Sequence, residues 1–304
     1  MRLKQLGEEP LVSVVIPVFN RAKQISNCLL SVCNQTYRNT EIIVVDDCST
    51  DETLAAVARC EDPRLRVVKA DRNGGAATAR NLGIEAARGD LVAFQDSDDY
   101  WVPHKIEDQV ERFRSLSDTH IGLYSGKIRY GKYGPGECSF VPHPNDHALS
   151  DRILETTAYK NHVTMQTLMV RREVFDGDLR FDPRLRANED WEFTLSLALL
   201  GKIAFDPQPH CIAEVSPDSI SRGLGRNVSS MLYIVRKHRC LLSTYPQALG
   251  QHFYGISRIL SRLRKYRLAN IVILHALRCD RYNWRCYVAF ALNAISRFMP
   301  IPRW

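Results

Sequence analysis

The sequence lacks any run of about 20 apolar residues, the length that a membrane-spanning helix requires. Its first ten residues, MRLKQLGEEP, contain no apolar segment, so the chain is expected to carry no secretory signal. The nine cysteines are scattered and none forms a CxxC pair, which argues against a disulfide framework or a zinc site. We therefore expect reduced thiols and a cytoplasmic protein.

Two common nucleotide-binding signatures are also missing. No GxGxxG follows the first apolar run, and no GxxxxGK[ST] occurs anywhere in the chain. These glycine-rich loops cradle phosphates in Rossmann dehydrogenases and in P-loop NTPases. The chain is therefore expected to belong to neither class.

The composition is that of an ordinary globular protein, with 45% hydrophobic and 25% charged residues among 304. The net charge of +7 is unevenly distributed. Tyr254–Trp304 holds ten Arg and Lys residues against a single acid, Asp280. The basic character therefore belongs to the carboxyl-terminal tail rather than to the whole chain.

Strand-like and helix-like segments alternate through the first hundred or so residues. Four short runs are predicted to be strands, and segments with helical spacing separate them. The first, second and fourth runs are apolar, as is typical of buried strands. The four runs are Leu11–Phe19, Glu41–Asp46, Leu65–Ala70 and Leu91–Phe94. Such alternation predicts an α/β fold, with a mostly parallel sheet and helices on both of its faces.

Polar side chains follow every one of these predicted strands. They are Asn20 and Arg21, then Asp46 and Asp47, then Asp71 and Asn73, and finally Asp96, Asp98 and Asp99. Ligands of parallel α/β sheets bind beyond the carboxyl ends of the strands. The sequence therefore predicts one ligand site at this edge of the sheet.

The last of these strand ends, LVAFQDSDDY, carries three carboxylates. Placing them close together costs free energy unless cations compensate their negative charge. Their hard oxygen atoms suit Mg²⁺ or Mn²⁺, which are often held by one or two carboxylates together with substrate phosphates. A solvated acidic turn before a helix that starts at Pro103 is the alternative. Asp47 could accept hydrogen bonds from a nucleotide base, Asp96 from a ribose, and Arg80 could face the base or the diphosphate.

Three stretches, VSVVIPVFNR, EIIVVDDCSTDET and NGGAATARNLGIEAARGDLVAFQDSDDYWVPHK, resemble the amino-terminal half of the family 2 glycosyltransferases. A later stretch, DPRLRANEDWEFTLSLALLG, resembles the acceptor-side segment of that family. The resemblance runs from about Leu11 to about Arg222. It implies an inverting enzyme with the GT-A fold.

The resemblance implies a nucleotide-sugar site, with UDP as the expected nucleotide. Asp47 matches the residue that bonds the uracil. Ser219, Ser221 and Arg222 have only a weak likeness to a serine-rich segment that the family often places near the diphosphate. Arg222 could help neutralise the leaving group there, and a plain loop arginine is the equal alternative. The residues expected to bind the nucleotide-sugar are Pro17, Phe19, Arg21, Asp47, Arg80, Asp96 and Arg222.

The resemblance also implies a metal ion and a general base. Asp96 and Asp98 fall on the DxD motif of the family, and we expect Asp98 and Asp99 to bind Mn²⁺ or Mg²⁺. Asp190 falls on the general base. An inverting transfer needs such a carboxylate to deprotonate the acceptor hydroxyl, and a metal to stabilise the leaving diphosphate. The alternative is that Glu189 and Asp190 are only first-turn acids of a helix.

We expect residues 1–224 to form the catalytic domain and residues 225–304 a basic helical extension. Apolar residues recur there at helical spacing: Trp284, Tyr287, Val288, Ala291, Leu292, Ile295 and Phe298. Such a helix can lie in an anionic membrane interface, which would place the protein on the inner face of the membrane. Packing on the catalytic domain or on a dimer partner is equally open. No nucleic-acid-binding motif accompanies the charge.

The sequence thus predicts a metal-dependent transfer of a sugar from a nucleotide-sugar to a glycan or a lipid-linked acceptor. A sugar nucleotidyltransferase is one alternative, but it would need a glycine-rich basic loop where the chain has PVFNRAKQ. A non-catalytic protein that keeps the fold to bind glycans or partners is the other. Such a protein would be expected to lose some of the site carboxylates, which are all present here.

Overall fold

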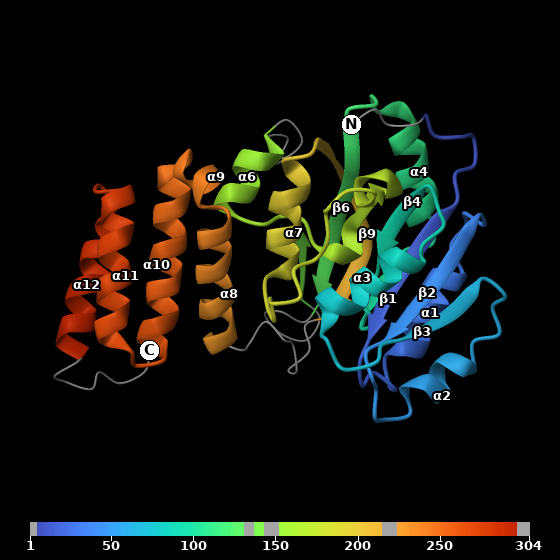
Figure 1. Cartoon of the computed structure of the whole chain (residues 1–304), viewed down its shortest axis with the longest axis horizontal. Coiled ribbons are helices and arrows are strands. Elements are labelled where there is room, and N and C mark those ends of the chain that lie inside the picture. Colours follow the sequence, from blue (N-terminus) through green and yellow to red (C-terminus); the bar gives the residue numbers. More distant parts are fainter. Residues whose placement is uncertain (1–4, 131–136, 143–151, 215–223, 297–304) are drawn as a thin grey trace. The chain divides into compact units, whose positions relative to one another are not determined.

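A computed structural model of the chain describes residues 5–130, 137–142, 152–214 and 224–296. The chain forms two compact units (Figure 1). The first comprises residues 1–154, 161–184 and 189–217, and the second comprises residues 155–160, 185–188 and 218–304. Each unit has its own hydrophobic clusters.

A nine-stranded sheet organises the first unit. The strand order is β3-β2-β1-β4-β8-β6-β9-β5, and β7 pairs with β6. The strands are β1 (Val12–Val18), β2 (Thr40–Asp46), β3 (Leu65–Lys69), β4 (Leu91–Phe94), β5 (Asp99–Trp101), β6 (His120–Tyr130), β7 (Cys138–Val141), β8 (Leu168–Arg171) and β9 (Lys202–Glu214).

The first four strands are parallel to one another, as the alternating sequence pattern predicts. The other half of the sheet is mixed, because β8 runs antiparallel to both β4 and β6, and β5 runs antiparallel to β9. The prediction of a mostly parallel sheet therefore holds for the amino-terminal half only. In that half, helical segments between successive strands provide the crossovers that parallel pairing needs.

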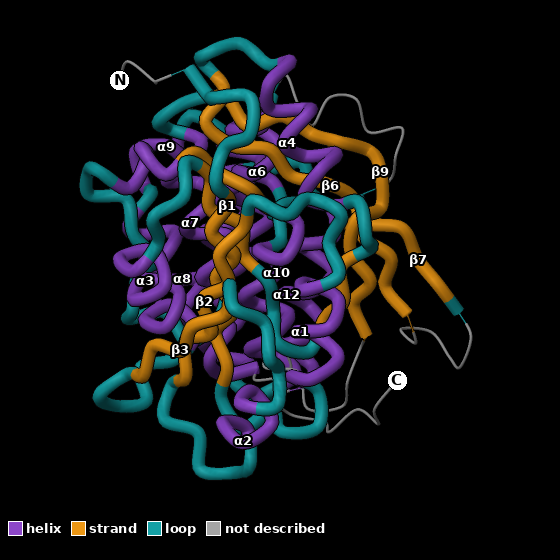
Figure 2. Tube along the Cα trace, turned by 90° about the vertical axis from the view of Figure 1, so that its right-hand side faces the viewer, coloured by secondary structure: helices purple, strands orange, loops and turns teal. Residues whose placement is uncertain are grey.

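Helices cover both faces of the parallel half of the sheet. They are α1 (Ile25–Cys33), α2 (Thr53–Ala58), α3 (Ala76–Ala86), α4 (Lys105–Ser115) and α7 (Glu189–Ala198). Val15 of β1 packs in one hydrophobic cluster with residues of α3 and α7, whereas Val14 and Ile16 pack in another with residues of α1, α2 and α4. Figure 2 shows α3 and α1 on opposite sides of β1 and β2. Burial on both faces explains why β1, β2 and β4 are largely apolar. The edge strand β3 is partly exposed and carries Arg66 and Lys69.

One glycine permits the close approach of α3 to the sheet. A Cβ atom at Gly83 would overlap the side chain of Val15, and Val45 lies close by. Because glycine carries no Cβ, α3 can pack directly on β1 and β2. This packing fixes the position of the other residues of α3, including Arg80.

The second unit is helical in its described part, as predicted for the extension. Its helices are α8 (Leu224–Lys237), α9 (Arg239–Ser243), α10 (Pro246–Arg262), α11 (Tyr266–Cys279) and α12 (Trp284–Ser296), and most of α6 (Ile153–Tyr159) also belongs to it. Within the residues described, no helix is both long enough and apolar enough to cross a membrane. The boundary between residues 224 and 225 stays a prediction.

Candidate active site

The predicted site lies at the carboxyl ends of β1, β2 and β4, and a hydrogen bond and an ion pair join these ends to one another. The Asn20 amide oxygen accepts a hydrogen bond from the Thr50 main-chain N–H (2.8 Å), which links the end of β1 to the segment after β2. Arg21 Nε lies 3.8 Å from Asp98 Oδ2, beyond the end of β4. Because neighbouring parallel strands end at the same edge, residues distant in sequence meet here.

Arg80 of α3 is the central cation of this edge. Its side chain is only 6% exposed and contacts two carboxylates. Nη2 donates a hydrogen bond to Asp96 Oδ1 (2.7 Å), and Nη1 donates one to Glu189 Oε1 (3.1 Å). Its guanidinium also lies 5.4 Å from the centre of the Phe181 ring. Arg80 therefore ties the end of β4 to the start of α7, and its predicted contact with the nucleotide stays a prediction.

Asp190 is the second residue of α7 and follows Glu189 directly. Its Oδ1 accepts a hydrogen bond from the Trp191 main-chain N–H (2.7 Å). Burial, followed by the negative charge of Glu189, raises the pKa of Asp190 to about 6, while the Trp191 N–H, Arg80 and Lys127 act in the opposite direction. A carboxylate with a pKa just below neutral is suited to accept a proton near pH 7.

The adjacent carboxylates of Asp98 and Asp99 face different surroundings. The Asp98 side chain is 38% exposed, and burial together with the Asp96 charge raises its pKa. Asp99 is buried, and its Oδ2 accepts a hydrogen bond from Gln166 Nε2 (2.6 Å). Burial, then Asp96 and Asp98, raises the pKa of Asp99 well above its usual value. Of these two residues, Asp98 is the one accessible to a ligand.

The donor atoms at this edge fit a divalent cation that shares its ligands with a substrate. Among the described residues, no group of three or more His, Cys, Asp and Glu side chains converges as a complete metal site. Mg²⁺ and Mn²⁺ are commonly held by one or two carboxylates, with the other ligands supplied by phosphates and water. Asp98, next to Asp96, offers the hard oxygen atoms that such an ion prefers.

Asp47 binds the turn that begins α3. Its Oδ1 accepts a hydrogen bond from the Gly74 N–H (2.7 Å), and its Oδ2 accepts one from the Gly75 N–H (2.7 Å). Gly75 has a φ of 81°, a backbone conformation that favours glycine. Asp47 thus satisfies N–H groups that a helix start leaves free. Its predicted bond to the uracil stays a prediction.

The other predicted nucleotide-binding residues have different positions. Pro17 is buried inside β1, whereas Phe19 is exposed just beyond the end of that strand. Contacts of either residue with a nucleoside stay predictions. Arg222 lies outside the described residues.

Three residues of this region were not singled out as ligands from the sequence. Glu189 holds Arg80, Gln166 holds Asp99, and Lys127 of β6 is buried. Burial lowers the pKa of Lys127, and the nearby negative charge of Asp99 opposes that effect. Glu189 had a local sequence signal, its place beside Asp190. Asp99 is distant in sequence from both Gln166, which bonds to it, and Lys127, on which its charge acts, and no local pattern predicts such contacts.

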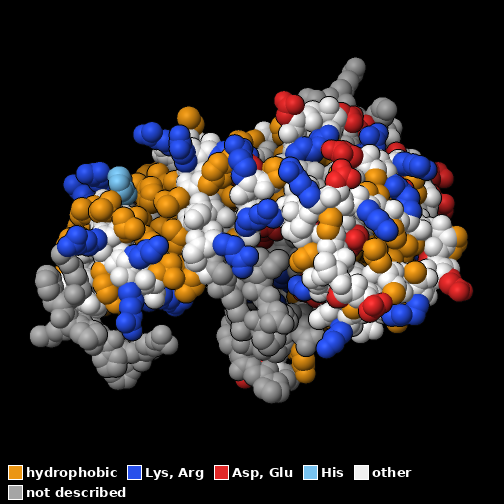
Figure 3. Space-filling view, turned by 60° about the horizontal axis from the view of Figure 1, so that its bottom comes forward, with side chains coloured by type: hydrophobic (Ala, Val, Ile, Leu, Met, Phe, Trp, Pro, Cys, Tyr) orange, Lys and Arg blue, Asp and Glu red, His pale blue; other side chains and the backbone are white. Residues whose placement is uncertain are grey.

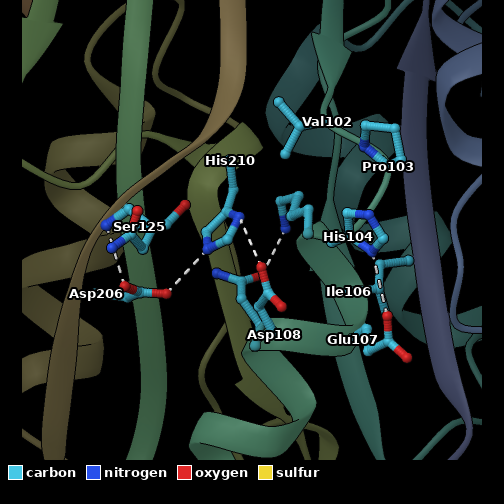
Figure 4. Close-up of polar contacts among 12 residues, drawn as sticks. Val102, Pro103, His104, Ile106, Glu107, Asp108, Ser125, Asp206 and His210 are labelled. Carbon is cyan, nitrogen blue, oxygen red and sulfur yellow. Dashed lines mark hydrogen bonds and ion pairs between the residues drawn. The ribbon is translucent and has the colours of Figure 1, made fainter.

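A second polar cluster joins α4 to β9 (Figure 4). The buried His210 lies between two carboxylates, with Nε2 3.0 Å from Asp206 Oδ2 and Nδ1 3.6 Å from Asp108 Oδ2. Since β9 pairs with β5, which begins at Asp99, this cluster supports the strand next to the acidic edge. We therefore interpret the role of this cluster as structural.

Comparison with known proteins gives consistent results. A family model described as "Glycosyl transferase family 2" matches residues 13–183. The succinoglycan biosynthesis protein ExoO of Rhizobium meliloti is 33% identical over 227 residues, covering 72% of this chain and 65% of that protein. The putative teichuronic acid biosynthesis glycosyltransferase TuaG of Bacillus subtilis is 34% identical over 208 residues, covering 68% of this chain and 79% of that protein.

A third relative is named for its reaction. WfaP of Escherichia coli, a UDP-Glc:alpha-D-GlcNAc-diphosphoundecaprenol beta-1,3-glucosyltransferase, is 37% identical over 169 residues, covering 50% of this chain and 63% of that protein. The chain thus spans about two thirds of the length of two of these three relatives.

Solved structures share the fold. S. aureus TarS 1-349 in complex with UDP-GlcNAc superposes with a TM-score of 0.64 at 20% identity, covering 94% of this chain and 92% of that one. The mannosyltransferase PcManGT from Pyrobaculum calidifontis, in complex with GDP-Man and Mn²⁺, superposes with a TM-score of 0.62 at 17% identity, covering 99% and 90%. At these identities the likeness concerns the fold alone, and the predicted GT-A-like fold is confirmed.

Proposed function

The chain belongs to glycosyltransferase family 2, and we propose that it transfers a sugar, with inversion, from a nucleotide-sugar to a hydroxyl of a glycan or lipid-linked acceptor. UDP is the nucleotide we favour, because the relative WfaP is named for a UDP-glucose donor. One observation carries the proposal. Arg80 binds both Asp96 and Glu189, so the candidate base Asp190 lies beside the carboxylates expected to bind the donor.

In this reaction Asp190 accepts the proton of the acceptor hydroxyl as its oxygen attacks the anomeric carbon. The bond from that carbon to the diphosphate oxygen breaks on the opposite face, and the electron pair leaves with the nucleoside diphosphate. The configuration at the anomeric carbon is therefore inverted. A base whose pKa lies near the working pH is both largely ionised and still able to hold the proton.

The part of the site that binds the sugar donor must compensate the negative charge of the leaving diphosphate. We propose that Asp98 would hold a Mn²⁺ or Mg²⁺ ion together with diphosphate oxygens, and that Asp96 and Arg21 contact the nucleotide. The predicted ligand Asp99 is less suited than Asp98, because Asp99 is buried and bonded to Gln166. When bound, such an ion would stabilise the negative charge on the diphosphate.

The pH dependence of transfer tests the role of Asp190. The raised pKa of about 6 means that the base is protonated, and inactive, in a growing fraction of molecules as the pH falls below that value. We expect kcat/KM at saturating metal to be level near pH 7.5 and to fall about tenfold per pH unit well below 6. Protein held at each pH and then assayed at pH 7.5 controls for denaturation. A profile that stays level down to pH 5 would contradict the assignment.

Calorimetric titration tests the donor and the metal. We expect one of UDP, GDP and TDP to bind in the presence of Mn²⁺ and to lose affinity after EDTA is added. Replacing Asp98 with alanine should weaken this metal-dependent binding by about tenfold or more, the effect of losing one of few ligands. The control variant is Asp118→Ala. Asp118 is an exposed aspartate just before the start of β6, and this variant should bind the nucleotide as the unmodified protein does.

Each other outcome of the titration has a definite meaning. Equal binding with and without EDTA would remove the metal from the proposal. If none of the three nucleotides bound, a non-catalytic protein with the same fold would become the better reading.

We also propose that residues 1–224 carry the transfer and that residues 225–304 hold the protein against the inner face of the cell membrane. The relatives supporting this setting are named for teichuronic acid, succinoglycan and diphosphoundecaprenol-linked chemistry. An acceptor linked to a lipid presents its hydroxyl at a membrane surface.

A further inference from the structure

The last two described helices expose a set of large apolar side chains, which we call the outer face. Its members on α11 and α12 are Leu268, Ile271, Leu274, Trp284, Tyr287, Val288, Leu292 and Ile295, all at least one-third exposed. Trp284 is 66% exposed. Figure 3 shows hydrophobic side chains gathered over these helices with Lys and Arg around them.

Helix α12 has its large side chains on the side away from the core of its unit. The residues that pack inward are small or polar: Cys286, Ala289 and Asn293. Asn293 is engaged in hydrogen bonds with Ser261 and Asn270. At about 100° per residue, these inward residues lie roughly half a turn from the centre of the outer face. The apolar stripe of α12 therefore does not form the core of the second unit.

Helix α11 repeats this arrangement. Ala269, Ile273 and Ala276 are buried, whereas Leu268, Ile271 and Leu274 are exposed on the other side. Buried residues of α11 and α12 share one hydrophobic cluster, so the two exposed stripes lie on neighbouring, packed helices. Exposed apolar patches of this kind mark surfaces that bind a partner or a membrane.

The charges around the outer face have one sign. Exposed cations on α11, on α12 and on the segments that precede them are Arg264, Lys265, Arg267, Arg278, Arg281 and Arg285. Within residues 264–296 the single acid is Asp280, which is partly buried. The surface therefore combines apolar side chains, aromatic rings and positive charge.

We propose that the outer face binds the surface of a bilayer that contains anionic lipids, with α11 and α12 lying in the plane of the headgroups. Apolar side chains would enter the acyl boundary, and the arginines would meet lipid phosphates. Trp and Tyr are suited to this depth because one end of each ring system is apolar and the other polar. A second copy of the chain fits less well, since pairing two such faces brings arginine against arginine.

The inference deepens the membrane contact proposed above for residues 225–304 by naming the surface that makes it and the lipid that it meets, and it rests on the proposed function for that contact. Its test needs neither donor nor acceptor. The two predictions can therefore fail independently. A protein that does not bind vesicles can still bind the nucleotide, and a protein that binds no nucleotide can still bind vesicles.

The experiment is flotation of the full chain with vesicles of phosphatidylcholine alone and with about 30% phosphatidylglycerol. We expect binding to the anionic vesicles, weakened by high salt because the arginine contacts are exposed to screening. In the triple variant Leu274→Gln, Val288→Gln, Leu292→Gln, the affinity for anionic vesicles should fall at least about tenfold, since apolar burial is lost at three positions. The control triple Leu30→Gln, Leu199→Gln, Leu200→Gln changes three exposed leucines of the first unit and should bind normally.

Four results would overturn the inference. They are no binding to anionic vesicles, equal binding to the neutral ones, an equal loss in both triple variants, and a vesicle-free dimer that the outer-face triple dissociates. The last result, read from sedimentation velocity, would assign the face to self-association. Far-ultraviolet circular dichroism of both triples checks that the helices are retained.

Discussion

Replacing Asp190 with asparagine is expected to abolish measurable transfer while leaving UDP binding almost unchanged. The proposed role of Asp190 is to take a proton, which the asparagine amide cannot do, and general-base catalysis contributes about 10²- to 10⁴-fold to a rate. Among the hydrogen bonds described, the Asp190 carboxylate accepts one from the Trp191 N–H and makes no bond to Asp96 or Arg80. We therefore expect a loss in kcat rather than in nucleotide affinity.

The same substitution should keep or raise the thermal midpoint at pH 7.5. The pKa of Asp190 in the folded chain, about 6, lies above that of an unfolded aspartate. Its contribution to stability is therefore fully present at pH values below the unfolded pKa and is lost as the pH rises through the folded pKa. At pH 7.5 the ionised side chain opposes folding, and the neutral amide removes that cost.

Transfer, UDP titration and thermal unfolding of Asp190→Asn would be measured beside Asp118→Asn, at the exposed aspartate already named as a control. The control should match the unmodified protein in all three. Unchanged turnover in Asp190→Asn would remove this residue from the mechanism. A large fall in its thermal midpoint would indicate a structural role instead.

Replacing Arg80 with methionine is expected to have the largest effect on stability and to reduce transfer as well. Arg80 is buried and is the cation bound to both Asp96 and Glu189. Removing one partner of a buried ion pair costs about 3 kcal/mol, because the remaining charges stay desolvated and unpaired. For a unit of this size that loss lowers Tm by roughly 10 °C.

The loss of Arg80 should also change the pH dependence of the remaining activity. Arg80 lowers the pKa of Asp190, so without it the acid limb of kcat/KM should move to higher pH. A residue that acted only by filling space would not produce this movement. Arg80→Lys keeps the charge, but an ammonium does not offer the two directed donor groups of a guanidinium, so we expect an intermediate result.

Arg59→Met is the matched control, since Arg59 is an exposed arginine of the same unit. Its thermal midpoint and pH profile should equal those of the unmodified protein. If Arg80→Met unfolded at the same temperature as this control, the ion pairs of Arg80 would make no net contribution to the free energy of unfolding.

The amino-terminal half of the fold was predictable because its signals are local. Three of the four strands from Leu11 to Phe94 are short apolar runs, and all four are followed by polar residues that parallel pairing brings to one edge. The second half was less predictable. The stretch from Met165 to Arg171 begins as a 3₁₀ turn, and the strand β8 that follows runs antiparallel to β4. Strand direction there depends on long-range packing that no local pattern encodes.

The sequence by itself determined the family, the α/β character, the acidic edge of the sheet and the presence of an apolar stripe in α12, since each depends on residue types at fixed short spacings. Only the tertiary structure decided that Arg80 joins Asp96 to Glu189, which lies 109 residues further along the chain. It also decided that Asp99 faces the interior while Asp98 is accessible, and that the stripe of α12 faces outward. Periodicity states which side chains share a face, but the packing of distant elements decides which face is buried and which charges meet.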